Sequence, residues 1–467
     1  MTYPEAIQFL YGLRWFGAKF GLENTLKLAA LAGNPQNQLR FIHVAGTIGK
    51  GSTCAMLESM YRAAGLRVGL FTSPHLVAFS ERIQVNREPM PPSEVERLVA
   101  EMRALLEPGW EQPRGGAQNP NSASEIATRA PRDLHPTASE LPTFFEVVTV
   151  MALRHFAARK CDLVIWETGL GGRLDATNIV RPLASVITNI QHDHQQWLGE
   201  TLTSIATEKA GIIKPGIPVI TGTHAPEALK VIEETAHRQN ASLTVVPVSA
   251  IQRPPLSTIQ LPLLGQHQRM NAAVAIATVR ALAAQLSVGE DAVRAGLSGV
   301  HWPGRLQLVT SRLVENQRIL LDGAHNVGGA EMLVAALKEY FPSAKPALVL
   351  GILRDKDWPA MCETLAPLAG RILLVPVPSE RSAAPQELAH ACRRANPQAQ
   401  VLAYDSLAAA LADAANIPFI TIAGSLYLIV EAMELLHLSP GKMNSERGLN
   451  EWGGTPCAAQ PTAIANP

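Results

Sequence analysis

Residues 41–52 read FIHVAGTIGKGS, and this stretch decides the fold class. Residues 41–45 are mostly apolar and predict a buried strand, which a glycine-rich loop follows directly. Residues 57–64 then carry apolar side chains three and four positions apart, the spacing of a helix. A strand, a glycine loop and a helix in this order form a unit whose backbone N–H groups attract phosphate.

Lys50 adds a positive charge to this loop and is the first candidate for catalysis. The loop departs from the Walker A pattern, because Gly51 lies between Lys50 and Ser52. A plain glycine turn with a solvated lysine is the alternative. The position between a strand and a helix favours phosphate binding.

The alternation of strand, loop and helix continues through the first 300 residues. Apolar runs predict strands at 67–72, 162–166 and 184–190, and a helical period covers 144–156. Such alternation predicts an α/β fold with a mostly parallel sheet covered on both faces. Ligands of these sheets bind at the carboxyl ends of the strands.

A second α/β unit is predicted beyond the sequence WPGR at residues 302–305. Its strands are expected at 319–321, 347–351, 372–375 and 419–422. The expected domains are therefore 1–302 and 303–438. Residues 108–140, with five prolines, are expected to form a surface insertion, and 439–467 an unstructured tail dispensable for chemistry.

Composition narrows the class of protein. The 467 residues include 40 basic and 40 acidic side chains, which argues against a general nucleic-acid binder. With 47% hydrophobic residues, the chain can bury a core and is not disordered. Five scattered cysteines without a CxxC pair argue against a disulfide framework or structural zinc. We found neither a signal peptide nor an apolar run of 18 residues, so a cytoplasmic protein is expected.

Polar residues follow the predicted strands. Glu167 comes after an apolar run and before a glycine-rich loop, where a carboxylate needs a cation. Beside a nucleotide that cation is Mg²⁺, and an ion pair with Arg173 is the alternative. Ser73 and His194 also end strands and complete a candidate magnesium site. Because residues 192–194 read HDH, a zinc hydrolase is kept as a rival hypothesis.

Three further positions have both structural and functional explanations. Lys209 lies at the end of a predicted helix, where it would offset the helix dipole. Asn271 opens an Ala/Val-rich helix, so N-capping explains it equally well. Residues 322–326 read DGAHN after a strand of the second unit, and three polar residues there exceed the need of a helix cap.

These motifs, in this order, resemble the folylpolyglutamate synthase/dihydrofolate synthase family of the Mur-ligase superfamily. The resemblance covers roughly residues 5–437 and rests on the glycine loop and on segments 72–76, 81–83, 167–178, 208–211, 302–305, 322–326, 355–357 and 424–427. It implies a P-loop-like nucleotide-binding domain followed by a smaller, Rossmann-like C-terminal domain. The two domains would close over the substrates.

The resemblance also implies roles for individual residues. Contacts to ATP fall on Gly49, Lys50, Gly51, Ser52, Asn271, Arg305 and Asp322. Magnesium ligands fall on Ser73, Glu167 and His194, and Lys209 matches a carbamylated lysine. His325 and Ser425 match positions near the incoming glutamate, and Lys50, Lys209 and His325 are the catalytic candidates. Pterin contacts fall on Thr143, Phe144, Phe145, Glu146, Leu174, Asp175 and Ala176.

The implied reaction is ATP-dependent amide formation. ATP phosphorylates the carboxylate of dihydropteroate or folate, and the amine of L-glutamate displaces phosphate from the acyl phosphate. The expected partners are these small molecules and Mg²⁺, with no nucleic acid, no membrane and a monomeric state. Residues 73–76 (SPHL) resemble bifunctional bacterial members, so both activities are expected, and a monofunctional folylpolyglutamate synthase is the alternative.

One position departs from the family pattern. Ile48 stands where the family usually has asparagine, so an amide beside the phosphates is absent. A lost hydrogen bond costs about 0.5–1.5 kcal/mol, which leaves a catalytically weakened nucleotide-binding homologue as another alternative. A cell-wall Mur ligase would need a UDP-sugar-binding domain before the glycine loop. Only 45 residues precede the loop here, so this alternative is disfavoured.

Overall fold

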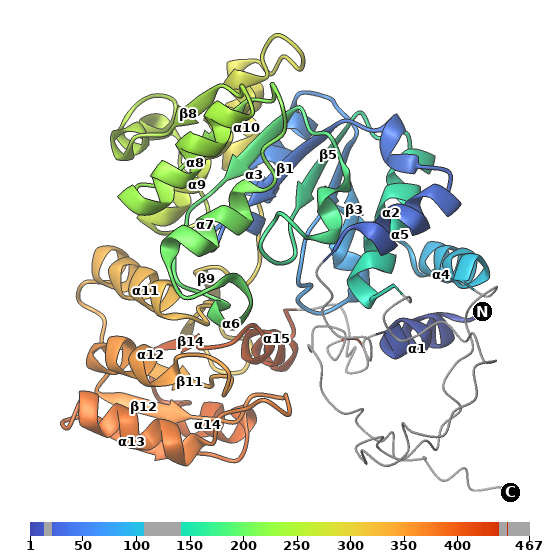
Figure 1. Ribbon diagram of the computed structural model, residues 1–467. Helices are drawn as coiled ribbons and strands as arrows, with labels where there is room; N and C mark the ends of the chain where they lie inside the picture. Colours follow the sequence, from blue (N-terminus) through green and yellow to red (C-terminus); the bar gives the residue numbers. More distant parts are fainter. Residues whose placement is uncertain (14–20, 107–141, 439–445, 447–467) are drawn as a thin grey trace, which may run out of the picture.

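The computed structural model of the chain describes residues 1–13, 21–106, 142–438 and 446. They form two sheets flanked by helices (Figure 1). The insertion predicted at 108–140 and nearly all of the tail predicted at 439–467 lie outside the described residues. In the described part of the chain, no helix combines the length and the apolar character needed to cross a membrane.

The first sheet has the strand order β4-β3-β2-β5-β1-β6-β7-β8. Its strands are β1 (Phe41–Ala45), β2 (Val68–Phe71), β3 (Ile83–Val85), β4 (Glu88–Pro89), β5 (Leu163–Glu167), β6 (Ala184–Ile187), β7 (Val219–Thr221) and β8 (Leu243–Val245). The run from β2 to β8 is parallel, and β3 and β4 extend it antiparallel. The predicted glycine-loop unit is found as β1 and α3, with β1 in the middle of the sheet.

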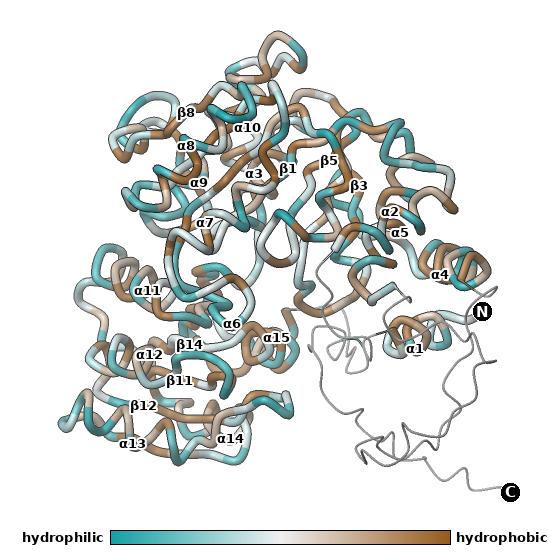
Figure 2. Tube along the Cα trace, in the orientation of Figure 1, coloured by the Kyte–Doolittle hydropathy of each residue, from teal (hydrophilic) through white to brown (hydrophobic). Residues whose placement is uncertain are grey.

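Helices cover both faces of this sheet. They are α1 (Tyr3–Leu13), α2 (Glu23–Leu31), α3 (Lys50–Ala63), α4 (Pro92–Leu106), α5 (Phe144–Ala158), α6 (Gln195–Leu198), α7 (Leu202–Ala210), α8 (Pro226–Arg238), α9 (Gln266–Ala281) and α10 (Glu290–Ser298). Short 3-10 helices occur at η2 (Pro35–Gln38), η3 (Phe79–Arg82), η5 (Ala176–Ile179), η6 (Val248–Gln252) and η7 (Leu256–Thr258). Hydrophobic residues concentrate in the strands and on the inner faces of the helices (Figure 2).

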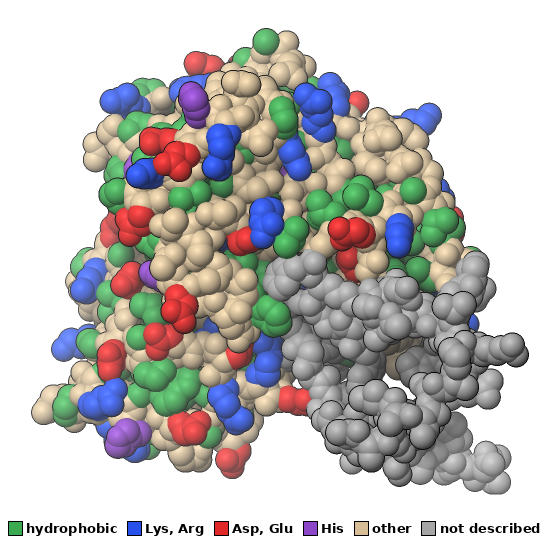
Figure 3. Space-filling model, in the orientation of Figure 1, with side chains coloured by type: hydrophobic (Ala, Val, Ile, Leu, Met, Phe, Trp, Pro, Cys, Tyr) green, Lys and Arg blue, Asp and Glu red, His purple; other side chains and the backbone are tan. Residues whose placement is uncertain are grey.

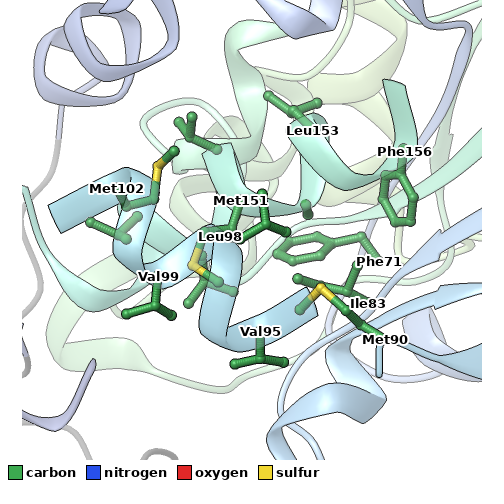
Figure 4. Close-up of a cluster of buried hydrophobic side chains, with 14 of the residues drawn as sticks. Phe71, Ile83, Met90, Val95, Leu98, Val99, Met102, Met151, Leu153 and Phe156 are labelled. Atoms are coloured by element: carbon green, nitrogen blue, oxygen red, sulfur yellow. The ribbon is translucent and has the colours of Figure 1, made fainter. Parts of the chain in front are cut away.

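Successive residues of a strand belong to hydrophobic cores on opposite faces of the sheet, because their side chains point alternately to the two faces. Phe41 and Trp166 join the core under α1, α4 and α5, part of which is drawn in Figure 4. Ile42 and Ile165 join the core under α3, α9 and α10. Trp166 is fully buried and stacks on Phe71 with 4.4 Å between ring centroids.

The second sheet has the order β13-β12-β11-β14-β10-β9. Its elements are β9 (Gln307–Thr310), β10 (Arg318–Leu321), α11 (Val327–Tyr340), β11 (Ala347–Leu350), α12 (Trp358–Leu365), η8 (Ala366–Leu368), β12 (Arg371–Leu374), α13 (Pro385–Ala395), β13 (Gln400–Ala403), α14 (Leu407–Asp413), β14 (Phe419–Ala423) and α15 (Leu426–Leu435). All pairs are parallel except β9 with β10. The predicted α/β class, a mostly parallel sheet followed by a smaller α/β unit, is confirmed.

The sequence analysis missed β9 and β13, the two edge strands of this sheet. Both are only partly buried, so neither has the apolar run that indicates a central strand.

The surface is mixed in charge, as zero net charge predicts. On the face drawn in Figure 3, basic and acidic side chains are interspersed over the described residues.

Glu446, which lies in the predicted tail, is buried and contacts the first unit. Its carboxylate accepts hydrogen bonds from the Phe79 backbone N–H (2.5 Å) and the Tyr3 hydroxyl (3.0 Å). Its carbonyl oxygen lies 3.1 Å from Nε2 of His75. Burial raises the pKa of Glu446, and the bonds from Phe79 and Tyr3 oppose that shift. Glu446 therefore holds the segment 73–82 in place. Deletion of the tail, which the sequence analysis expects to be dispensable for chemistry, would remove these contacts.

We predict that Glu446→Ala lowers the free energy of unfolding by about 1–3 kcal/mol, because a buried backbone N–H loses its acceptor. Chemical denaturation measures this change. Glu363→Ala is the matched control, since Glu363 forms an exposed ion pair with Arg394 and should change stability by less than about 1 kcal/mol. Equal losses in the two variants would contradict a structural role for Glu446.

Candidate active site

A cavity of about 380 Å³ lies between the first sheet and the second α/β unit. Its wall is built from loops that directly follow β1, β2, β5 and β6 of the first sheet and β10, β11 and β14 of the second. This is the carboxyl edge of both sheets, where α/β folds bind ligands. The volume is typical of small-molecule sites. The two units meet near α6 and α15 (Figure 1).

The glycine loop forms part of the cavity wall, which includes Gly49, Lys50, Gly51 and Ser52. Gly49 has φ +85°, and a Cβ atom there would lie 2.3 Å from Oδ1 of Asn271, so only glycine fits. Lys50 opens α3, and its Nζ donates to the carbonyl oxygen of Gly46 at 3.2 Å. The N-terminus of α3 and a lysine therefore face the same space, an arrangement that attracts anions.

Ile48 also lies in the cavity wall. Its backbone N–H donates to Asn189 Oδ1 at 2.8 Å, and its carbonyl oxygen accepts from Thr188 Oγ1 at 2.7 Å. Its side chain reaches toward the second unit, since Cδ1 lies 3.3 Å from the Cβ position of Gly328. The backbone of the loop is thus held from the end of β6, while the apolar side chain contacts α11.

Glu167 ends β5 and is buried. Its Oε2 accepts a hydrogen bond from the Ser73 backbone N–H at 2.9 Å, which joins the ends of β5 and β2. Burial raises the pKa of Glu167 to about 7, against the opposing charge of Lys50. The alternative ion pair with Arg173 is wrong, because Arg173 pairs with Glu208 at 2.8 Å.

His194 follows β6 and lies in the cavity wall with Ser73 and Glu167. The rival zinc cluster at residues 192–194 does not form. Asp193 accepts a hydrogen bond from Asn326 Nδ2 at 2.9 Å and pairs with Lys356 Nζ at 3.2 Å. Among the residues that the structure describes, no three His, Cys, Asp or Glu side chains are grouped to hold a metal ion.

Lys209 lies in the last turn of α7, but dipole compensation does not account for its position. It is buried, and its Nζ donates to the carbonyl oxygen of Gly46 at 2.9 Å. Lys50 donates to the same oxygen, so two ammonium groups converge there. Burial, with the charge of Lys50, lowers the pKa of Lys209 to about 7.

All seven residues of the expected pterin region line the cavity: Thr143, Phe144, Phe145, Glu146, Leu174, Asp175 and Ala176. Two of them also hold the local backbone. Glu146 Oε2 accepts from the Thr143 N–H at 2.6 Å as part of a capping box at the start of α5. Asp175 accepts from the Leu170 N–H at 2.8 Å. Apolar rings and buried acceptors thus occur on the same wall.

The second unit contributes Arg305, Asp322, His325 and Ser425 to the cavity. Asp322 accepts hydrogen bonds from the N–H groups of Leu306 (2.8 Å) and Ala324 (2.9 Å). His325 Nδ1 lies 2.8 Å from the carbonyl oxygen of Gly323, so neutral His325 carries its proton on Nδ1 and leaves Nε2 basic. Burial, with the charge of Lys356, lowers the pKa of His325 to about 4.

Asp193 joins the two units through Asn326 and Lys356. Its side chain is only 10% exposed. Burial by itself would raise the pKa of Asp193, but the charge of Lys356 holds it well below its usual range. The carboxylate therefore stays charged and bonded to the second unit at neutral pH.

Asn271 is the sequence-predicted site residue that the structure does not bring to the cavity wall. It lies behind Gly49, and its Nδ2 donates to Gln268 Oε1 at 3.1 Å. N-capping is wrong as an explanation, because α9 begins five residues earlier at Gln266. His267 and Gln268 of α9 line the cavity instead.

The sequence analysis also missed three basic residues of the wall: Arg82, Lys356 and Arg381. Arg82 and Lys356 lie within segments 81–83 and 355–357 that carried the family resemblance, so a signal for them was present. Arg381 lies in the loop between β12 and α13, where no motif marked it.

Comparison with known proteins agrees with this geometry. Residues 304–425 match the family model described as Mur ligase, glutamate ligase domain. The chain is 35% identical to the dihydrofolate synthase/folylpolyglutamate synthase of Bacillus subtilis, over 93% of this chain and 99% of that protein. It is 34% identical to the folylpolyglutamate synthase of Lacticaseibacillus casei, over 92% and 97%.

A solved structure of E. coli FolC in complex with DHPP and ADP has a TM-score of 0.77 to this chain, with 29% identity, and the match covers 94% of this chain and 98% of that one. The family expected from the sequence is confirmed, as is the class of ATP-dependent ligase. This chain belongs to the dihydrofolate synthase/folylpolyglutamate synthase family.

Proposed function

We propose that this chain joins L-glutamate to dihydropteroate and to folates, using ATP to convert the acceptor carboxylate into an acyl phosphate. The observation that carries this proposal is a cavity whose wall includes both the Lys50 loop and, from the second unit, His325 and Ser425. A nucleotide, an aromatic acceptor and an amino acid must meet in one space for this reaction. Relatives named for both activities support the same conclusion.

In this proposal the phosphates of ATP bind at Gly49–Ser52, with Lys50 moving its ammonium group from the Gly46 carbonyl oxygen to the phosphates. Arg305 and Asp322 would contact the nucleotide from the second unit. Asn271 would act by supporting Gly49 from behind. The complexes of similar proteins with ADP or AMPPCP support the use of ATP.

Mg²⁺ would be held by Ser73, Glu167 and His194. The site fits this ion, because buried Glu167 shares the cavity wall with Ser73 and His194, so the protein offers few ligands and phosphate and water oxygens can supply the others. When bound, the ion neutralises charge on the phosphate groups. Lys209 would be carbamylated: its neutral amine forms an N–C bond to CO₂ and loses one proton. The low pKa of Lys209 keeps part of the amine neutral for that step.

The reaction has two steps. An oxygen of the acceptor carboxylate attacks the γ-phosphorus of ATP, and ADP leaves. The amine of L-glutamate then attacks the acyl carbon, inorganic phosphate leaves, and the amine loses a proton. His325 can orient that amine by accepting a hydrogen bond on Nε2, because its Nδ1–H is engaged by the Gly323 carbonyl oxygen.

The acceptor would lie along Phe144, Phe145, Leu174 and Ala176, with its carboxylate toward Lys50. The Asp193 contacts close the seam between the units and help to keep water from the acyl phosphate. Activity on folates alone is the second candidate. A cytoplasmic location and a monomeric state stay predictions.

The test is to incubate the protein with ATP, Mg²⁺ and L-glutamate and either dihydropteroate or tetrahydrofolate, and to weigh the products. We expect a glutamyl residue to be added to dihydropteroate and one or more to tetrahydrofolate (poly-γ-glutamylation), with ADP and phosphate released. Product from tetrahydrofolate alone would establish the monofunctional alternative. No ATP-dependent product from either acceptor would contradict the proposal.

Lys50→Ala should lower the rate of this assay by about 100-fold or more, because a charge that stabilises the transferring phosphoryl group is lost. Lys230→Ala, an exposed lysine on α8, is the matched control and should keep the wild-type rate. Wild-type turnover by Lys50→Ala would overturn the role of the glycine loop.

Glu167→Gln should raise the Mg²⁺ concentration needed for half-maximal activity by about 10-fold or more, because a neutral amide is a poor ligand for a hard cation. A magnesium titration at fixed ATP measures this change. Glu227→Gln, an exposed residue of α8, should leave the titration unchanged. An identical titration of Glu167→Gln and wild type would remove Glu167 from the metal site.

A further inference from the structure

A chain of three buried polar side chains runs from the middle of the first sheet to the cavity wall. His43, in the middle of β1, lies with its Nε2 atom 2.9 Å from Thr177 Oγ1. The hydroxyl group and the backbone N–H of Thr177 both donate to Asp175 Oδ1. His43 and Thr177 are completely buried, and of these three residues only Asp175 lines the cavity. The chain therefore reaches the site from behind its wall.

The direction of each hydrogen bond follows from the protons that the groups carry. A carboxylate only accepts, so the single hydroxyl proton of Thr177 goes to Asp175. Thr177 Oγ1 then accepts from His43, which places the ring proton on Nε2. Burial, with the charge of Lys214, lowers the pKa of His43 to about 3. The ring is therefore neutral, and Nδ1 carries no proton.

The free nitrogen of His43 shows that this ring is an expensive way to fill space. Nδ1 is buried and has no hydrogen-bond partner among the residues that the structure describes. An unpaired polar atom in the interior costs free energy, and leucine would fill a similar volume without that cost. What the imidazole supplies, and a hydrocarbon side chain lacks, is the Nε2–H bond to Thr177.

The neighbouring strand fixes the backbone of Thr177. Trp166 of β5 is the partner of His43 in the register of β1 and β5, so both side chains lie on the same face of the sheet. Trp166 Nε1 donates to the Thr177 carbonyl oxygen at 2.9 Å. Two paired residues of the central strands thus hold Thr177, one at its hydroxyl group and one at its carbonyl group.

The Asp175 carboxylate is in turn held at both oxygens. Oδ1 accepts the two bonds from Thr177, and Oδ2 accepts from the Leu170 N–H at 2.8 Å. Oδ2 also faces Gly169, where a Cβ atom would lie 3.1 Å from it and 2.6 Å from the Phe145 ring. Burial raises the pKa of Asp175, and the hydrogen bonds from Thr177 and Leu170 oppose that shift. The chain therefore helps to keep an oriented, charged carboxylate beside an aromatic ring of the wall.

Helix capping explains only part of this arrangement. Asp175 is the N-cap of η5, and the bond from the Thr177 N–H is sufficient for that role. Neither the Thr177 hydroxyl group nor the His43 ring is needed for a cap.

We infer that His43 and Thr177 are positioning residues for the acceptor: they hold the Asp175 carboxylate in the orientation that accepts N–H groups of the fused ring of dihydropteroate or a folate. This inference rests on the proposed function, which places the acceptor along this wall. It adds two residues that do not touch the substrates.

The test is steady-state kinetics of Thr177→Val, which removes the hydroxyl group and nearly keeps the shape of the side chain. We expect KM for the acceptor to rise about 10-fold or more, because a hydrogen bond to a charged group is lost. KM for ATP and for L-glutamate should stay at the wild-type values. Thr177→Ser keeps the hydroxyl group and should restore KM for the acceptor.

A second pair of variants makes the same comparison at His43, and it decides the question if Thr177→Val does not fold. His43→Leu should raise KM for the acceptor about 3-fold to 10-fold, because a hydrogen bond between neutral groups is lost. His43→Gln keeps an N–H donor and should restore most of that loss.

A double-mutant cycle separates this role from a general loss of structure. In an Asp175→Asn background, Thr177→Val should change KM for the acceptor by less than about 2-fold, because Thr177 acts through Asp175. Thr278→Val is the matched control. Thr278 is equally buried, but its hydroxyl group donates to the Val274 carbonyl oxygen of its own helix, so all three KM values should stay at the wild-type values.

Three results would overturn the inference. The first is an unchanged KM for the acceptor in Thr177→Val and His43→Leu. The second is an equal increase in KM for all three substrates, and the third is an undiminished effect of Thr177→Val in the Asp175→Asn background. The proposed function fails separately, if wild type itself forms no glutamyl product.

Discussion

The convergence of two lysines on one backbone oxygen is the constraint on which the site depends. Lys50 of α3 and Lys209 of α7 both donate to the Gly46 carbonyl oxygen, at 3.2 Å and 2.9 Å. Two ammonium groups at such a distance repel each other, and burial strengthens the repulsion. An anionic ligand relieves it, and so does conversion of one amine into a carbamate. The end of β1 would therefore stabilise the phosphate groups that the proposed function places there.

The second unit completes this site across a seam of polar and apolar contacts. Asp193 bonds to Asn326 and Lys356, and Gln266 donates to Glu339 at 2.7 Å. Ile48 adds an apolar contact with Gly328 at the mouth of the glycine loop. Leu76 of the first unit also packs against the core of the second, so polar and apolar contacts together link the two units. Ile48, at the position where the resemblance predicts asparagine, therefore adds to the contact between the two units.

The sequence predicted the central strands and the loops that follow them, because both carry strong local signals. The β1 boundaries agree with the prediction at both ends, and Lys50, Ser73, Glu167 and His194 do share one cavity. Edge strands β9 and β13 were missed, since half-buried strands have no apolar run. The tertiary partners of Asn271, Asp193 and Arg381 were also out of reach, because each depends on segments distant in the chain.

The central claim is that the strand ends of the first unit and Asp322 of the second hold one magnesium nucleotide between them. A crystal structure with Mg²⁺ and a non-hydrolysable ATP analogue tests it most directly. The account predicts phosphate oxygens within hydrogen-bond distance of Lys50 Nζ, a metal ion ligated by Glu167, and Asp322 or Arg305 in contact with the nucleotide. A nucleotide bound elsewhere, with Lys50 still on the Gly46 carbonyl oxygen, would contradict it.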